Sequence, residues 1–297
     1  MRRLRFLTLA LALLATALPL RAQPAKRLQV VASFSILADM AREVAGDAAQ
    51  VHSLVGPNAD AHVFEPTPSD AQRLAKADLV IVNGLHFEGW IDRLVRASGY
   101  RGQVVEATQG IVPRRAGRSV DPHAWQSLAH AQRYVENIRA ALVALAPAQA
   151  AGIDARARAY AARIAELDAR SRAAFEAIPR EQRRVVSTHD AFGYLGEAYG
   201  ITFISPRSWN TESEASAAGV ASVIRQVRLH QARALFVENI TDRRSIERIA
   251  QETGAQVGGT LYSDALSAPG RGAATYLELM AHNVEAIAGA LRAASAR

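Results

Sequence analysis

The chain has 297 residues, of which 49% are hydrophobic and 21% are charged, and it has no cysteine and a formal net charge of +7. This composition is typical of a globular protein of one large or two ordinary domains, and it excludes a disordered chain, a disulfide scaffold and a metal site built on cysteine. The positive charge makes nucleic-acid binding the first hypothesis to test.

The N-terminal segment accounts for more than half of the positive charge. Three arginines within the first five residues precede an apolar run from Phe6 to Leu18. This run is shorter than the roughly 20 apolar residues of a membrane-spanning helix. The pattern predicts a cleaved secretory signal peptide over residues 1–22. Cleavage after Ala22 removes four arginines and leaves 31 basic and 28 acidic residues, a net charge of +3.

The remaining basic residues do not form a nucleic-acid-binding pattern. The only lysines are Lys26 and Lys76, and the arginines are spread along the chain rather than gathered in one stripe. We therefore expect no nucleic-acid partner. Because a bacterial lipoprotein is acylated on a cysteine, we expect a periplasmic protein that is not lipid-anchored.

Strands and helices alternate in the first part of the mature chain. Short apolar or β-branched runs predict strands, and apolar residues at spacings of three and four predict helices. The expected strands are 28–32, 51–55, 78–82 and a short one near Val104, and the expected helices are 36–44, 68–76 and 90–97. This alternation predicts a parallel sheet covered by helices on both faces.

The chain after His123 has a helical pattern. One apolar stripe covers 128–145 and ends before Pro147, and a second covers 153–178. A helix over 148–178 is about 45 Å long at 1.5 Å per residue. That length is too great for a crossover within one compact domain, so we interpret residues 148–178 as a rigid connecting helix between two lobes.

A second alternation of strands and helices occupies the C-terminal part. Strands are expected at 184–187, 201–204, 234–237 and near Val257, and helices near 192–199, 214–229, 242–253 and 274–291. The chain is thus predicted to be an α/β protein with an N-terminal lobe over 23–147 and a C-terminal lobe over 179–297, each a parallel sheet flanked by helices. Such sheets bind ligands at the carboxyl ends of their strands, which places the site in the crevice between the lobes.

Three histidines and one aspartate lie in loops that can face this crevice. They are His62, His123, His189 and Asp264, two from each lobe. Three imidazoles and one carboxylate form a four-coordinate cage that suits a divalent transition metal. Because 61, 66 and 75 residues separate them, no local metal motif is present and their spacing alone is weak support.

The other five histidines have ordinary structural interpretations, which are commoner for a lone histidine. His130 and His282 lie within predicted helices. His230 ends a helix, where a cation suits the helix dipole, and His52 lies in a strand. His86 follows a strand near the crevice and is a minor candidate for the site.

Several segments resemble one protein family. They are AHVFEPTPSD at 61–70, DPHAW at 121–125, STHDAFGYLGEAYGI at 187–201, TESEAS at 211–216, and FVENITD and GGTLYSDALS within 236–267. Over essentially the whole mature chain, the sequence resembles the cluster 9 metal-binding solute receptors of ABC importers, which deliver zinc, manganese or iron.

The resemblance implies two α/β lobes with a bracing helix and a cognate ABC membrane permease as partner. It also implies that His62, His123, His189 and Asp264 are the metal ligands. We expect a monomer, and a periplasmic metallochaperone is a further candidate partner.

The third ligand bears on the choice of metal. Within the family that the chain resembles, histidine at this position is typical of zinc receptors and glutamate of manganese receptors, and this chain has His189. An additional imidazole also favours zinc on chemical grounds, although a bidentate Asp264 relaxes that preference. The histidine-rich loop of many zinc receptors is missing, since 106–120 contains arginines and no histidine, and so is their disulfide. The chain thus resembles a zinc receptor without that loop, or a receptor that binds both zinc and manganese.

Four carboxylates are candidates to accept hydrogen bonds from the ligand imidazoles, because each lies near a ligand in the sequence or at a strand end. They are Glu65, Asp121, Asp190 and Glu238. A solvated or helix-capping role is an equally good interpretation for each of them.

A receptor explains the predicted site better than an enzyme does. Catalytic zinc keeps one coordination position for water or substrate, whereas four protein ligands close the tetrahedron. The alternatives are a periplasmic zinc hydrolase, with Glu65 or Glu238 as its base, and a receptor for a metal chelate. No second hydrolase motif is present, and an aromatic content of 6% argues against a chelate site. We predict a periplasmic binding protein, not an enzyme, that captures Zn²⁺, or alternatively Mn²⁺, for an ABC permease.

Overall fold

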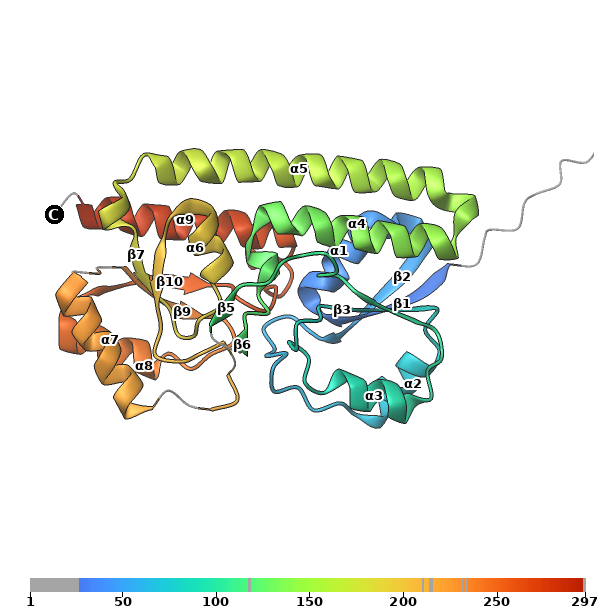
Figure 1. Cartoon of the computed structure of the whole chain (residues 1–297), viewed down its shortest axis with the longest axis horizontal. Helices are drawn as coiled ribbons and strands as arrows, with labels where there is room; N and C mark the ends of the chain where they lie inside the picture. Colours follow the sequence, from blue (N-terminus) through green and yellow to red (C-terminus); the bar gives the residue numbers. More distant parts are fainter. Residues whose placement is uncertain are drawn as a thin grey trace, which may run out of the picture.

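The computed structural model describes residues 27–116, 119–209, 211–213, 216–230, 232 and 234–295 (Figure 1). The predicted signal peptide lies outside these residues. Two lobes lie side by side, and one long helix runs along both of them.

The first lobe is built on a four-stranded parallel sheet of order β2-β1-β3-β4. Its strands are β1 (Leu28–Phe34), β2 (Ala49–Val55), β3 (Leu79–Val82) and β4 (Gln103–Glu106), and its helices are α1 (Ser35–Ala45), α2 (Pro68–Ala75) and α3 (Ile91–Ser98). All four residues of β3 are buried, as expected for an inner strand with both faces covered. A capping box between Thr67 and Asp70, with Pro68 in the first turn, fixes where α2 begins.

The second lobe has a four-stranded parallel sheet of order β10-β9-β7-β8. Its strands are β7 (Arg184–Val186), β8 (Thr202–Ile204), β9 (Ala234–Glu238) and β10 (Gln256–Leu261), and its helices are α6 (Gly193–Tyr199), α7 (Ala217–His230), α8 (Arg244–Thr253) and α9 (Tyr276–Ser295). Inner strand β9 is buried along its whole length. The predicted fold of two lobes, each a parallel sheet flanked by helices, is confirmed.

Helix α5 (Ala150–Glu176) spans the two lobes and follows α4 (Leu128–Leu145). It packs against α1 and α4 of the first lobe and against α6 and α9 of the second. One hydrophobic core contains buried residues of both lobes and of α5, among them Val30, Ile164 and Phe236. A smaller core lies between the second sheet and helices α7 and α8. The shared core restrains how the lobes can move relative to each other.

The structure adds short elements that the sequence pattern did not indicate. They are the antiparallel strands β5 (Arg115–Ala116) and β6 (Ser119–Val120) and the 3-10 turns η1 (Gly46–Ala48), η2 (Ala124–Gln126), η3 (Pro147–Gln149) and η4 (Arg180–Gln182). Two- and three-residue elements are too short to show a hydrophobic period. The β5-β6 hairpin lies in the segment that leads to His123.

Within the described ranges, no single helix is long and apolar enough to cross a membrane. Only α4 taken together with the following η3 and α5 has that length and composition, and this pair is bent by 119°. The apolar residues of α4 lie largely in the hydrophobic core, for example Tyr134 and Ile138.

Candidate metal centre

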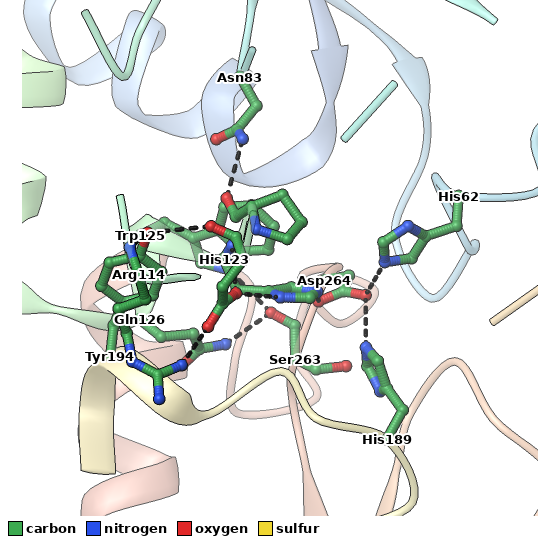
Figure 2. A network of polar contacts seen from close by, with 12 residues as sticks. His62, Asn83, Arg114, His123, Trp125, Gln126, His189, Tyr194, Ser263 and Asp264 are labelled. Atoms are coloured by element: carbon green, nitrogen blue, oxygen red, sulfur yellow. Dashed lines mark hydrogen bonds and ion pairs between the residues drawn. The ribbon is translucent and has the colours of Figure 1, made fainter. Parts of the chain in front are cut away.

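The four residues singled out in the sequence lie together between the lobes. One ligand atom from each of His62, His123, His189 and Asp264 lies within 4.8 Å of the others. His62 is in the loop between β2 and α2, and His123 directly precedes η2. His189 follows β7, and Asp264 follows β10. Loops after strand ends thus deliver two side chains from each lobe to one point (Figure 2).

The Asp264 carboxylate lies at the centre of this group. Its Oδ2 atom is 3.2 Å from His62 Nε2 and 3.3 Å from His189 Nε2, and its Oδ1 atom is 3.6 Å from His123 Nε2. All three Nε2 atoms and both carboxylate oxygens are buried and have no hydrogen-bond partner in the described part of the chain. Buried polar atoms without partners are costly. A bound cation would satisfy all five at once.

Two further carboxylates orient the imidazoles. His123 Nδ1 lies 2.8 Å from Asp121 Oδ1, and His189 Nδ1 lies 2.5 Å from Glu238 Oε2. With Nδ1–H facing a carboxylate, each ring directs its Nε2 lone pair toward the site. Glu238 also accepts hydrogen bonds from the Thr188 hydroxyl and the His189 backbone N–H. These contacts fix both rings before any ligand arrives.

The other two carboxylates considered from the sequence do not share this role. Glu65 is exposed. Asp190 is largely buried, and burial raises its pKa. Neither makes a hydrogen bond or ion pair with an imidazole of the site within the described ranges.

Mutual charge outweighs burial in setting the pKa values of the site. Burial alone would raise the pKa of Asp264, but the imidazoles of His123 and His189 hold it well below its ordinary value. Burial likewise would lower the pKa of His189, but the carboxylates of Glu238 and Asp264 raise it well above its usual value. Asp264 is therefore an anion, and a proton on His189 competes with a metal for the same nitrogen.

Aromatic side chains that the sequence reasoning did not single out position His62. The centre of the Phe87 ring lies 4.7 Å from the centre of the His62 ring. Trp90 Nε1 donates a hydrogen bond of 2.8 Å to the carbonyl of Ala61. The backbone N–H of His62 donates to Asp60 Oδ1. Both aromatic residues lie in the loop and turn between β3 and α3. In the sequence they were visible only as two apolar residues within a loop.

The Asp264 loop is joined to the first lobe. The carbonyl of Ser263 accepts hydrogen bonds from Trp125 Nε1 at 2.9 Å and Gln126 Nε2 at 2.7 Å. Trp125 lies two residues after His123 and was part of the DPHAW segment. This pairing holds Asp264 of the second lobe beside His123 of the first (Figure 2).

Four of the other histidines, His52, His86, His130 and His282, lie outside the cluster. His86, the minor candidate, is exposed and has a φ of 63°. His130 packs on Tyr194, and His282 packs on Tyr262. His52 is half-buried in β2. The structure brings none of these into the four-residue group.

The chain matches the family described as zinc-uptake complex component A, periplasmic, over residues 30–290. The iron-binding protein YfeA of Yersinia pestis is 37% identical, over 89% of this chain and 86% of the relative. The manganese-binding lipoprotein MntA of Halalkalibacterium halodurans is 34% identical, over 87% of this chain and 86% of the relative.

Solved structures of similar proteins have the same fold. A manganese-bound periplasmic metal-binding protein of Candidatus Liberibacter asiaticus, the S38A mutant, has a TM-score of 0.84 at 33% identity and covers 90% of this chain and 100% of its own. The periplasmic zinc-binding protein TroA of Treponema pallidum has a TM-score of 0.86 at 28% identity and covers 90% and 99%.

These relatives are binding proteins of metal transport, and their names give iron, manganese and zinc. The site described above agrees with that role, because its donor atoms are those of a divalent metal site. The chain belongs to the family of periplasmic component A of zinc-uptake complexes, and it is a metal-binding substrate-binding protein of an ABC importer, not an enzyme.

Proposed function

We propose that His62, His123, His189 and Asp264 bind one Zn²⁺ ion as the transported substrate. The observation that carries this proposal is the set of three unpartnered Nε2 atoms around both oxygens of one carboxylate. Imidazole suits zinc, whereas manganese prefers sites with more oxygen ligands. Two of the imidazoles also have carboxylates on Nδ1, which raises their basicity toward a metal.

Manganese is the second candidate, on one specific observation. Both Asp264 oxygens face imidazoles, so the carboxylate is placed to bind a metal through two atoms. Three nitrogens and two oxygens give a five-coordinate site, which a zinc ion does not require. A relative that is 34% identical is named for manganese and one that is 37% identical is named for iron.

Elemental analysis and competitive titration against a chelator test the site on the purified chain. We expect one Zn²⁺ per chain and a tighter complex with Zn²⁺ than with Mn²⁺ or Fe²⁺. His62→Ala, His123→Ala and His189→Ala should each abolish or greatly weaken binding, and the exposed His86→Ala serves as the matched control. Stoichiometric binding that survives all three substitutions would refute the ligand set. Tighter binding of Mn²⁺ would refute zinc as substrate.

We further propose a periplasmic monomer without a lipid anchor, which delivers its metal to the cognate permease, with a periplasmic metallochaperone as a further candidate partner. The absence of cysteine supports the unanchored form, whereas several relatives are named lipoproteins. Mass spectrometry of the protein isolated from its native host tests this directly. The mass of a chain that begins near Gln23 is expected, and an added acyl mass would contradict it.

A further inference from the structure

Arg114 lies in the segment that precedes His123, where the sequence has arginines instead of histidines. Its Nη1 atom contacts Asp121 Oδ2, and its Nε atom donates to Glu197 Oε1 at 2.7 Å. Asp121 is fully buried, whereas the side chain of Glu197 is 65% exposed. Arg114 therefore joins a buried carboxylate beside the metal centre to the surface of the protein.

This contact also crosses between the lobes. Glu197 and Tyr194 belong to α6 of the second lobe. The backbone N–H of Arg114 donates to the Tyr194 hydroxyl at 3.0 Å, and that hydroxyl donates to the carbonyl of Asp121 at 2.9 Å. The guanidinium also lies over the Tyr194 ring, 5.6 Å from its centre. The segment before His123 thus contacts α6 through both the backbone and the side chain of Arg114.

The first residue of α6 makes room for this arginine. A Cβ atom built on Gly193 would lie 1.7 Å from Arg114 Nη1, which is an impossible contact. A side chain at this position would require the guanidinium to shift from the place that it occupies beside Asp121 and Glu197. Gly193 of α6 thus leaves the space that the Arg114 guanidinium occupies.

Arg114 also changes the net charge of the metal centre. Three buried carboxylates, Asp121, Glu238 and Asp264, surround the imidazoles. Arg114 neutralises Asp121, and within the described ranges Glu238 has no ion pair with an arginine or lysine. Because Arg114 shares its one positive charge between Asp121 and Glu197, a net negative charge remains at the site, and a divalent cation offsets it when the imidazoles are neutral.

We propose that Arg114 is a positioning residue for metal binding, which holds Asp121 against His123 Nδ1 and fastens the His123 segment to α6. This inference rests on the proposed function, because it takes His123 as a ligand. Through Asp121, the guanidinium keeps the Nε2 atom of His123 directed at the metal. Through Glu197 and Tyr194, it resists separation of the two lobes, so its loss should speed metal release more than it slows metal capture.

The test compares Arg114→Met with Arg115→Met in the full chain. Arg115 is exposed in β5 and provides the same change of charge in the same segment. Arg114→Met should weaken Zn²⁺ binding about 10- to 100-fold, the usual effect of losing an outer contact of a metal ligand, mainly through faster dissociation into excess chelator. Arg115→Met should bind as the unaltered chain does. Equal affinity and dissociation rate in the two variants would overturn the proposal.

A spectroscopic measurement distinguishes a specific effect of Arg114 on His123 from a general loosening of the whole site. In the zinc-loaded chain with ¹⁵N-labelled histidine, the Nδ1–H protons of His123 and His189 both face carboxylates and should exchange slowly with water. Arg114→Met should accelerate exchange at His123 and leave His189 unchanged. Acceleration at both rings would indicate a merely structural effect and would contradict the proposal.

A milder variant covers the case in which Arg114→Met does not fold. Glu197→Gln removes the exposed partner of Arg114 and leaves Asp121 intact, so we expect faster zinc release by no more than about fivefold. Arg114→Lys, which keeps the charge but not the forked geometry, should lie between the unaltered chain and Arg114→Met. No change in Glu197→Gln and Arg114→Lys would also overturn the proposal. If the unaltered chain binds no metal, the proposed function fails instead.

Discussion

The two buried imidazole–carboxylate pairs, His123 with Asp121 and His189 with Glu238, have the same arrangement but different surroundings. Each pair comes from one lobe, and each ring presents Nε2 to Asp264. Asp121 is neutralised by Arg114, whereas the other contacts of Glu238 are the hydroxyl of Thr188 and a backbone N–H. The uncompensated Glu238, together with Asp264, raises the pKa of His189 well above its usual value. A proton on His189 should therefore compete with the metal.

Removal of Asp264 should have the largest effect, because this carboxylate contacts both pairs and His62. Asp264→Ala leaves three imidazoles facing one another with no anion between them. We expect a loss of zinc affinity greater than the roughly 100-fold limit typical of outer contacts, measured by chelator competition. Asp92→Ala, an exposed carboxylate in the first turn of α3, is the matched control. An affinity loss below tenfold, relative to the control, would show that Asp264 is not a ligand.

The pH dependence of binding tests the pair of His189 and Glu238. Because the folded pKa of His189 is raised, the metal-free chain keeps a proton there to a higher pH, and a metal must expel it. Zinc affinity should therefore rise with pH until that pKa is passed, and fall as the pH is lowered. Of the two carboxylates that raise this pKa, Glu238 has the larger effect. Glu238→Gln should therefore weaken binding and shift the pH dependence to lower pH.

Asp121→Asn is the matched comparison for Glu238→Gln. Both variants should weaken binding by about 10- to 100-fold. Glu238→Gln should shift the pH dependence to lower pH, as measured by chelator competition at a series of pH values. An unchanged pH dependence in Glu238→Gln would contradict the role of Glu238 in raising the pKa of His189.

Glu88 provides a buried carboxylate without an imidazole. It accepts hydrogen bonds from the Ser33 hydroxyl and the Asn83 backbone N–H, yet burial raises its pKa from 4.5 to about 7. In Glu238, by contrast, the neighbouring His189 outweighs burial and lowers the pKa. Burial alone thus raises the pKa of the Glu88 carboxylate, whereas burial beside the His189 imidazole leaves the pKa of Glu238 lowered.

The raised pKa of Glu88 predicts a pH-dependent stability. Because the folded chain binds this proton more tightly than the unfolded chain, the contribution is fully present below about pH 4.5 and is lost as the pH rises through about 7. The loss is on the order of 3 kcal/mol in the free energy of unfolding. Glu88→Gln should remove this slope in urea denaturation of the metal-free chain. A slope as steep as that of the unaltered chain would rule out Glu88 as its source.

Trp90→Phe should have the smallest effect. It removes the hydrogen bond to the carbonyl of Ala61 and keeps an aromatic ring beside Phe64. We expect a loss of about 1 kcal/mol in the free energy of unfolding, measured by urea denaturation. Zinc affinity should fall by less than about tenfold, since the loop of His62 keeps its contact with Asp60. Unchanged stability and affinity would show that the indole does not position His62.

The sequence predicted the fold where periodicity extends over many residues, as in β1, α1 and the long α5. It also singled out, from their positions after strands and from the family resemblance, four residues that the structure brings close together. It could not separate Asp121 and Glu238 from Glu65 and Asp190, because proximity along the chain does not give the direction of a side chain.

Arg114 was not singled out for a related reason. Its partner Glu197 is 83 residues away, in the other lobe, and the hairpin that precedes His123 has two-residue strands. Contacts of this kind depend on how the two lobes pack against each other. Only the folded chain brings an arginine of one loop beside a carboxylate of a distant helix.

Anomalous diffraction from crystals of the zinc-loaded chain tests the central claim most directly. The data should show one zinc peak, bonded to the Nε2 atoms of His62, His123 and His189 and to the carboxylate of Asp264. A zinc peak bonded to other residues, or a peak that His189 or Asp264 does not contact, would contradict the proposed centre.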